Sequence, residues 1–178
     1  MILIDQFSYP EIYHFPWSKR NNQGDLGIET FSRYGVIPSI QQFEGLQIVV
    51  TEKYSDKCLS LHQNLSSQLL ENKWDKRFSK LPQEYKIIGR NLKKGNILFI
   101  EWFEVISIFD ENNVCLSWEE IEFYCKLLNF RMIQVIWKGI WDLDFIKNLN
   151  NKQEGYILRA SARIPFHMLH IFSVKCNF

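Results

Sequence analysis

A basic stretch with interleaved aromatic side chains lies between residues 73 and 94. Its cations are Lys73, Lys76, Arg77, Lys80, Lys86, Arg90, Lys93 and Lys94. Two carboxylates oppose them, and three aromatic rings lie among them. Because cations neutralise phosphates and aromatic rings stack on bases, the pattern suits single-stranded nucleic acid, with Lys76, Arg77 and Lys80 as the expected contacts. A solvated loop whose charges only aid solubility explains the stretch equally well.

The cysteines do not predict a metal site. Cys58, Cys115, Cys125 and Cys176 form no CxxC pair and no spacing that is typical of a zinc site. A free cysteine usually behaves as a small buried hydrophobic residue. We therefore expect four buried, reduced thiols.

Strand patterns dominate the elements that must position any site. Residues 5–45 are an irregular, aromatic-rich lead-in, interrupted by Pro10, Pro16 and Pro38. Residues 64–84 are polar and predict a loop or a short helix. Alternating or β-branched runs predict strands over residues 47–53, 57–63, 85–88, 97–109, 132–137, 155–160 and 171–176.

One helix has a clear start signal. Ser117 and Glu120 form a capping box, and apolar residues then recur at helical spacing until about Asn129. A shorter helix is expected over residues 142–149. Strands surround these helices without regular βαβ alternation, which favours an α+β domain of largely antiparallel sheets. We expect a single domain over residues 1–178, with a lead-in over 1–45 and a core over 46–178.

Composition limits the possible partners. The 178 residues are 46% hydrophobic, which is typical of a folded chain, and the net charge of +1 indicates no partner by itself. A nucleic-acid surface would therefore be a local patch. The apolar start is too short for a signal peptide, and no run reaches the ~20 residues of a membrane span. We expect a cytoplasmic protein with no membrane partner.

Several segments carry a family resemblance through their order and spacing. They are Tyr9-Pro10, His14 to Ser18, Ile37 to Lys53, Ile88 to Asn91, Trp102 to Asn112, Cys115 to Trp118, Glu154 to Arg159 and Ser173 to Lys175. Together they resemble the small ATP-dependent RNA ligases of the covalent nucleotidyltransferase superfamily. The resemblance covers almost the whole chain, although no single segment is specific.

This resemblance implies an ATP-grasp-like fold, with antiparallel sheets and flanking helices around a nucleotide cleft. It also implies that Lys53 attacks the α-phosphate of ATP and becomes lysyl-AMP. The AMP would then pass to an RNA 5′-phosphate, and a 3′-hydroxyl would displace it, as in RNA repair of single-stranded or nicked ends. A lysine at its reference pKa of about 10.4 is almost fully protonated, so its surroundings must favour the neutral amine. Mg²⁺ must neutralise the phosphates. Without the resemblance, Lys53 is an ordinary strand-end lysine.

Further residues take family roles by position. Glu154 corresponds to a carboxylate that contacts the lysine or the metal, and Lys175 to a lysine that holds the α-phosphate. Glu52 adjoins the nucleophile and is an expected nucleotide contact. Phe103 or Trp102 is the expected adenine-stacking ring. Taken alone, Glu154 is an exposed turn residue, Lys175 a surface lysine, and the two aromatic rings core residues.

The sequence also departs from the family pattern. Asp56 stands where the family has a glycine three residues after the nucleophile. Arg90 replaces a glutamate that contacts ribose or supports the metal, and a cation there should repel Mg²⁺. Glu104 stands where an aromatic residue is usual. The family continues past the fifth motif with an arginine and a tail, whereas this sequence has Phe178, so a protein partner could supply the tail.

These departures leave two functions open besides a full ligase. The chain could be a pseudo-ligase, with the fold but no sealing activity, that binds nucleotide, RNA or another protein. It could also be a purely structural protein, in which the Lys53, Glu154 and Lys175 positions have no chemical role.

Overall fold

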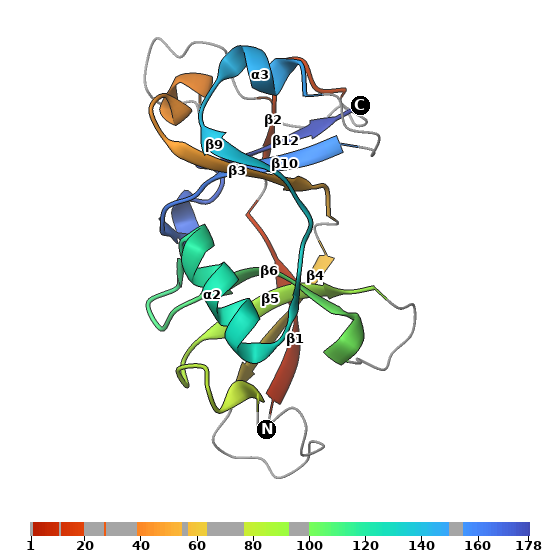
Figure 1. Ribbon diagram of the computed structural model, residues 1–178, viewed down its shortest axis with the longest axis vertical. Coiled ribbons are helices and arrows are strands. Elements are labelled where there is room, and N and C mark those ends of the chain that lie inside the picture. Colours follow the sequence, from red (N-terminus) through yellow and green to blue (C-terminus); the bar gives the residue numbers. More distant parts are fainter. Residues whose placement is uncertain are drawn as a thin grey trace. The chain divides into compact units, whose positions relative to one another are not determined.

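A computed structural model describes residues 2–10, 12–19, 27, 39–54, 57–63, 77–92, 100–149 and 155–178 (Figure 1). The chain divides into two compact units, each built from two segments of sequence. Unit 1 consists of Met1–Tyr9 and Ser55–Ile133, and unit 2 of Pro10–Tyr54 and Gln134–Phe178. The expected single domain with a lead-in to residue 45 stays a prediction.

Unit 1 is built on a mainly antiparallel sheet. Its strands, in spatial order, are β1 (Ile2–Ser8), β4 (Lys57–Gln63), β5 (Lys86–Asn91), β6 (Phe103–Phe109) and β7 (Val114–Cys115). The short β8 (Arg131–Met132) lies parallel to β6, and a 3₁₀ turn, η2 (Ile100–Trp102), precedes β6. All residues of β6 are buried, which makes this strand the centre of the unit.

Helix α2 (Trp118–Leu128) packs against β6 and β8 through one apolar stripe. Both hydrogen bonds of its predicted capping box form, because Ser117 Oγ accepts from Glu120 N and Glu120 Oε2 accepts from Ser117 N. Its C-cap is Asn129 in the left-handed conformation, with φ 53°. The buried stripe contains Trp118, Ile121, Cys125 and Leu128.

Unit 2 is built on a second sheet. Its strands, in spatial order, are β2 (Tyr13–His14), β12 (Ser173–Asn177), β10 (Gly155–Ala160), β3 (Gln47–Glu52) and β9 (Val135–Ile140). Neighbours are antiparallel except β2 and β12, which are parallel. The remaining elements are η1 (Ile40–Phe43), α3 (Leu143–Lys147), β11 (Ile164–Pro165) and η3 (Phe166–Met168).

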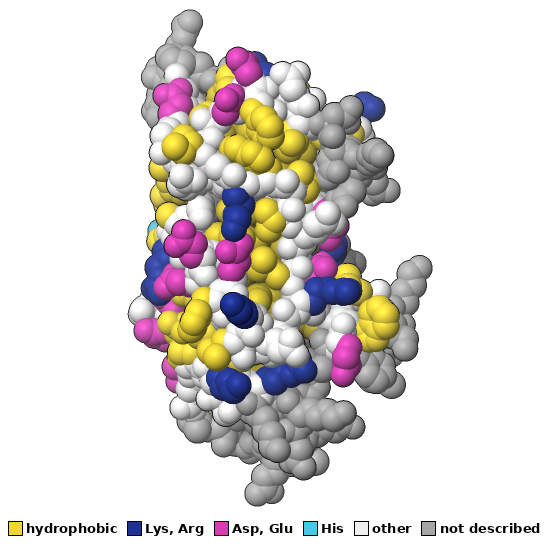
Figure 2. Space-filling view, in the orientation of Figure 1, with side chains coloured by type: hydrophobic (Ala, Val, Ile, Leu, Met, Phe, Trp, Pro, Cys, Tyr) yellow, Lys and Arg dark blue, Asp and Glu magenta, His cyan; other side chains and the backbone are white. Residues whose placement is uncertain are grey.

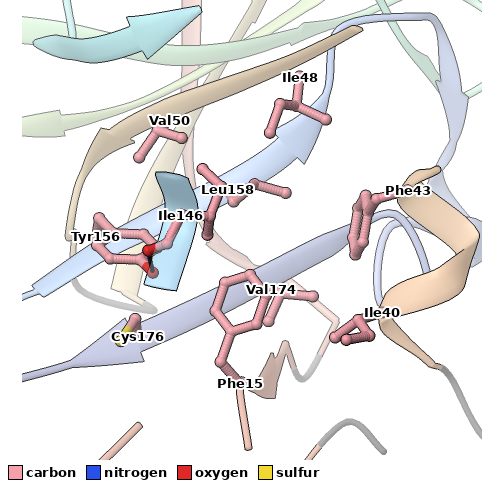
Figure 3. Close-up of a cluster of buried hydrophobic side chains, with 10 residues drawn as sticks. All are labelled: Phe15, Ile40, Phe43, Ile48, Val50, Ile146, Tyr156, Leu158, Val174 and Cys176. Atoms are coloured by element: carbon pink, nitrogen blue, oxygen red, sulfur yellow. Dashed lines mark hydrogen bonds between the residues drawn. The ribbon is translucent and has the colours of Figure 1, made fainter. Parts of the chain in front are cut away.

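One face of the unit 2 sheet carries the hydrophobic core of that unit (Figure 3). Alternate residues of its three central strands contribute, including Val50, Tyr156 and Val174. Phe15, the two η1 residues Ile40 and Phe43, and Ile146 of α3 cover them. Because side chains alternate across a strand, the residues between these positions face the opposite side of the sheet.

Most predicted elements form within a few residues of their expected bounds, and the fold class is confirmed. Two expectations were wrong. Residues 2–8 form strand β1 rather than an irregular lead-in, because they pair along β4 over its whole length. The strand expected over residues 132–137 is two strands, because the chain leaves β8 after Met132 and starts β9 at Val135.

All four cysteines are free and buried, as expected. Burial, with a smaller contribution from Glu122, raises the pKa of the Cys125 thiol to about 12. None of the helices in the described part of the chain is long and apolar enough to cross a membrane.

Candidate functional site

Strand β3 positions Lys53, the predicted nucleophile. Ile48, Val49 and Val50 are almost completely buried, which fixes the strand in the middle of the unit 2 sheet. Its last residue, Glu52, donates its backbone N–H to Gln134 O at 3.1 Å. Lys53 follows directly and is half-buried. The strand therefore ends by presenting a lysine at the sheet edge.

The sheet register places Lys175 in the same row as Thr51, two residues before this lysine. Thr51 pairs with Ile157, and Ile157 pairs with Lys175, so these three residues form one row. The face of this row lies opposite the hydrophobic core. Lys53 lies two residues beyond Thr51, directly after the end of β3. Lys175 lies on β12, which is separated from β3 by β10 alone.

Glu154, the predicted metal and nucleotide ligand, lies outside the described residues. It directly precedes β10, whose first residue is Gly155. Gly155 has φ 144°, and a Cβ there would lie 2.0 Å from Cys176 O. Only glycine fits this close approach of β10 to β12.

Glu52 does not share the face of Lys53. It pairs with Tyr156, a residue of the core cluster. Strand alternation therefore directs its side chain to the core face of the sheet. The expected nucleotide contact of Glu52 stays a prediction that this register does not favour.

A buried polar cluster lies at the edge of the same sheet that is formed by β2, where β2 pairs with β12. His14 pairs with Lys175 and is 1% exposed, and its Nδ1 lies 2.9 Å from Ser18 Oγ. Ser18 Oγ also accepts from Asn177 N at 2.8 Å. The side chain of Asn177 donates through Nδ2 to Lys19 O at 3.1 Å. These hydrogen bonds hold the end of β12 against the segment from His14 to Lys19.

Arg90 and Glu104, both departures from the family pattern, contact each other in unit 1. They are directly paired on β5 and β6. Glu104 Oε2 accepts from Arg90 Nε at 2.7 Å and lies 2.6 Å from Arg90 Nη2. Glu104 is almost buried, whereas a quarter of the Arg90 side chain is exposed. The adjacent carboxylate offsets the charge of Arg90, and the expected effects of this cation on Mg²⁺ or on a phosphate stay predictions.

Phe103 is a core residue, which was the alternative to a ring that stacks on adenine. Its side chain is fully buried, and its ring makes an edge contact with Phe130 at 6.1 Å. A Cβ at Gly89 would lie 2.5 Å from the Phe103 ring, so the ring rests directly on that glycine. Trp102 is 45% exposed, which leaves it as the accessible ring of the pair.

Two of the described cations in the basic stretch have other partners in unit 1. Arg77 Nη1 donates to Asn129 O at 3.0 Å, at the C-terminus of α2, where a cation stabilises the helix. Phe78 is buried, and Arg90 is paired as described above. Lys80 is exposed, and Lys76 lies outside the described residues. On the face in Figure 2, cations and carboxylates are interspersed.

Metal ligands are sparse in the part of the chain that the structure describes. No group of three or more His, Cys, Asp or Glu side chains lies close enough there to hold an ion. Magnesium commonly uses only one or two carboxylates together with the phosphates of a substrate. The described lysines fit those phosphates, and Glu154 is the carboxylate that the sequence offers for the metal.

The sequence did not single out His14, Ser18 or Asn177 as a polar cluster. The first two lie within a segment that carried the family resemblance, but no role followed from it. Asn177 had no signal at all, since its importance depends on the pairing of β12 with β10 and β2.

Comparison with known proteins supports the fold. No family model and no curated protein matches the sequence. An archaeal ATP-dependent RNA ligase superposes with a TM-score of 0.56 at 14% identity, covering 79% of this chain and 44% of that protein. An RNA ligase from Naegleria gruberi gives 0.55 at 16% identity, covering 78% and 51%. This chain thus spans about half the length of these proteins. It has an RNA ligase-like fold.

Proposed function

We propose that this chain is an RNA ligase-type nucleotidyltransferase that binds ATP, takes AMP onto Lys53 and acts on RNA 5′-phosphate and 3′-hydroxyl ends. The observation that carries the proposal is the pairing of β3, β10 and β12. Lys53 directly follows β3, Lys175 lies on β12, and β10 joins these two strands, which supports a shared site for the two lysines. RNA enters the proposal because both similar structures are named as RNA ligases.

The proposed reaction has a nucleophile, a phosphate ligand and a leaving group. The neutral amine of Lys53 attacks the α-phosphorus, so a P–N bond forms, the bond to pyrophosphate breaks and the amine proton passes to solvent. Lys175 holds the α-phosphate oxygens from the neighbouring row. An RNA 5′-phosphate oxygen then attacks the AMP phosphorus and releases Lys53. Finally, a 3′-hydroxyl attacks the activated 5′-phosphate and AMP leaves.

Magnesium, bound to ATP and to Glu154, would supply charge neutralisation of the phosphates. The chain's own residues do the remaining work. Lys175 orients the α-phosphate by charge-assisted hydrogen bonds. The fixed end of β3 limits the positions that the Lys53 amine can adopt, and such positioning contributes strongly to the rate of a transfer reaction.

The first experiment is incubation with α-labelled ATP and Mg²⁺, followed by a denaturing gel. We expect label on the protein, and no label after Lys53→Ala. Lys147→Ala is the matched control, since Lys147 lies on α3, which packs on the core face of the same sheet. Its ammonium lies 5.6 Å from the centre of the Trp17 ring, so its loss is tolerable. Equal labelling of Lys53→Ala and the unmodified chain would reject Lys53 as the acceptor.

A pseudo-ligase is the second candidate, and one observation favours it. The Arg90–Glu104 ion pair stands at two positions where the family pattern has a carboxylate and an aromatic ring. A paired arginine cannot ligate a metal, so the unit 1 contribution to transfer would be absent. ATP binding that depends on Lys53 and Lys175, without any covalent label, would favour this candidate over the enzyme.

A further inference from the structure

Helix α2 carries a second apolar stripe on its outer face. Phe123 is 59% exposed and Leu127 is 39% exposed, and the two residues lie one helical turn apart. Two residues turn a helix by about 200°, so Phe123 lies opposite the buried residues Ile121 and Cys125. Single exposed apolar residues are common on protein surfaces, whereas two on one helical face form a contiguous patch. Helix α2 is therefore apolar on opposite faces, and the sheet of unit 1 packs against one of them.

Aromatic side chains extend this patch. The ring of Phe123 makes an edge contact with the ring of Tyr124 at 5.4 Å between centroids, and Tyr124 contacts Tyr85 in the same way at 5.9 Å. Figure 2 shows hydrophobic side chains over α2. We call Tyr85, Phe123, Tyr124 and Leu127 the outer stripe. Its rings hold one another in place at the surface of unit 1.

The charges beside the outer stripe change from acidic to basic along the helix. Glu119 lies one turn before Phe123 and Lys126 lies about one turn after it, and both charged residues are exposed. Seven residues separate Glu119 from Lys126, so the two lie on nearly the same line along the helix. This order also suits the helix dipole. When two such helices pack antiparallel, the acidic end of each lies beside the basic end of the other.

We infer that the outer stripe is a self-association surface, on which α2 of a second copy of this chain packs antiparallel. A two-fold axis beside Phe123 makes the same patch serve both copies. It brings the two Phe123 rings together and sets Glu119 of each copy beside Lys126 of the other. Packed helix axes lie about 8–10 Å apart, which a glutamate and a lysine side chain can bridge. The charge order selects a second copy over another protein, because a self-paired α2 complements its own charges.

The test measures the mass of the full chain in solution by sedimentation velocity at increasing protein concentration. The outer stripe is smaller than the surface that stable complexes bury, so we expect a weak dimer with a Kd of about 10–100 µM. Phe123→Lys should weaken this dimer about tenfold or more, since two ammonium groups would meet at the centre of the contact. Ile140→Lys is the matched control and should leave the Kd unchanged, because Ile140 is equally exposed, at 60%, but lies on β9 of unit 2.

Exchange of the two charges tests the antiparallel arrangement. Glu119→Lys and Lys126→Glu should each weaken the dimer about tenfold, because each brings like charges together at two symmetry-related places. The double variant Glu119→Lys/Lys126→Glu should return the Kd to within about threefold of its original value, since both pairs form again with their signs exchanged.

Three results would overturn the inference. They are a chain that stays monomeric up to about 200 µM, above the expected Kd, a dimer that survives Phe123→Lys, and single losses that add in the double variant. Binding of another protein to the outer stripe without self-association would also overturn it. None of these measurements uses ATP or Lys53, so their outcome is independent of the proposed function.

Discussion

The two units treat the positions of the family resemblance differently. Unit 2 carries Lys53 directly after β3 and Lys175 on β12, in a sheet whose register is fixed by buried neighbours on three strands. Unit 1 replaces a carboxylate by Arg90 and an aromatic ring by Glu104, and the two new residues form an ion pair. The two lysines of the proposed covalent chemistry thus belong to unit 2. In unit 1, the departures from the family pattern are an arginine and a glutamate that form an ion pair.

This contrast indicates that the departures in unit 1 are compensated and not random. A buried Glu104 without a cation would be costly, because its charge would lose its hydration without gaining a partner. Each substitution makes the other tolerable. Restoring only one of them, as in Arg90→Glu, would put two carboxylates on neighbouring strands. We therefore expect that single reversion to destabilise unit 1.

The largest expected effect concerns the glycine at the start of β10. Gly155→Ala should lower the free energy of unfolding by about 3 kcal/mol or more, because a methyl group meets Cys176 O in a backbone conformation that alanine rarely adopts. Gly45→Ala is the matched control, with φ 74° and open space around it, and should cost only about 1 kcal/mol. Equal losses in thermal or denaturant unfolding would show that β10 does not need this close approach.

In unit 1 the corresponding test removes one partner of the ion pair. Arg90→Met should cost about 2–3 kcal/mol, since it leaves the nearly buried Glu104 unpaired. Glu104→Gln should cost less, because Arg90 is partly exposed. The double variant Arg90→Met/Glu104→Met should recover most of the loss. If the two single losses simply add in the double variant, the pair does not stabilise unit 1 through mutual contact.

Alkaline pH should reveal the buried thiol of α2. The pKa of Cys125 is raised from 9.0 to about 12 in the folded chain. Its contribution to stability is therefore complete below pH 9 and is lost as the pH rises from 9 towards 12. By pH 10 the loss is about 1 kcal/mol. Urea unfolding between pH 8 and 10.5 should show a smaller pH slope in Cys125→Ala, and an unchanged slope would assign the alkaline loss to other groups.

Burial also raises the pKa of Tyr156 and Cys176 in unit 2, so some alkaline loss remains in that variant. The sign is the same for these two groups, because burial favours their neutral forms. The comparison of Cys125→Ala with the unmodified chain isolates the contribution of α2.

The smallest expected effect separates the two described cations at the start of the basic stretch. Lys80→Ala should reduce the salt dependence of RNA binding by about one unit of slope, since one phosphate contact is lost. Arg77→Ala should leave that slope unchanged and cost about 0.5–1 kcal/mol of stability, because Arg77 caps α2 through Asn129 O. Titrations of single-stranded RNA at several salt concentrations provide the measurement. An effect of Arg77 on the slope with none of Lys80 would reverse these roles.

Local signals in the sequence predicted the elements that depend on neighbouring residues. The capping box of α2 and the apolar runs of β3 and β10 are set within a few residues, and these elements formed as expected. Strand β1 could not be recognised in this way, because its place in the sheet depends on β4, which is far away in the sequence.

In the candidate site, too, local motifs indicated some residues, whereas others depend on strand register. Lys53 and Lys175 were predicted because each stands in a segment with a family resemblance, and their roles stay predictions. The Arg90–Glu104 contact and the pairing of Gly155 with Asn177 depend on strand register, which no single segment determines. Phe103 was expected to contact the nucleotide because its position in the motif suited an aromatic ring. In the structure its ring is buried and lies directly against Gly89 on the neighbouring strand.

The most direct test of the central claim is to locate AMP on the chain. After incubation with ATP and Mg²⁺, the protein is digested and its peptides are mapped by mass spectrometry. Our account predicts one AMP moiety on Lys53, its loss on addition of pyrophosphate, and no adduct in Lys53→Ala. An adduct on any other lysine, or an unmodified Lys53 in a chain that binds ATP with full dependence on Lys175, would contradict it.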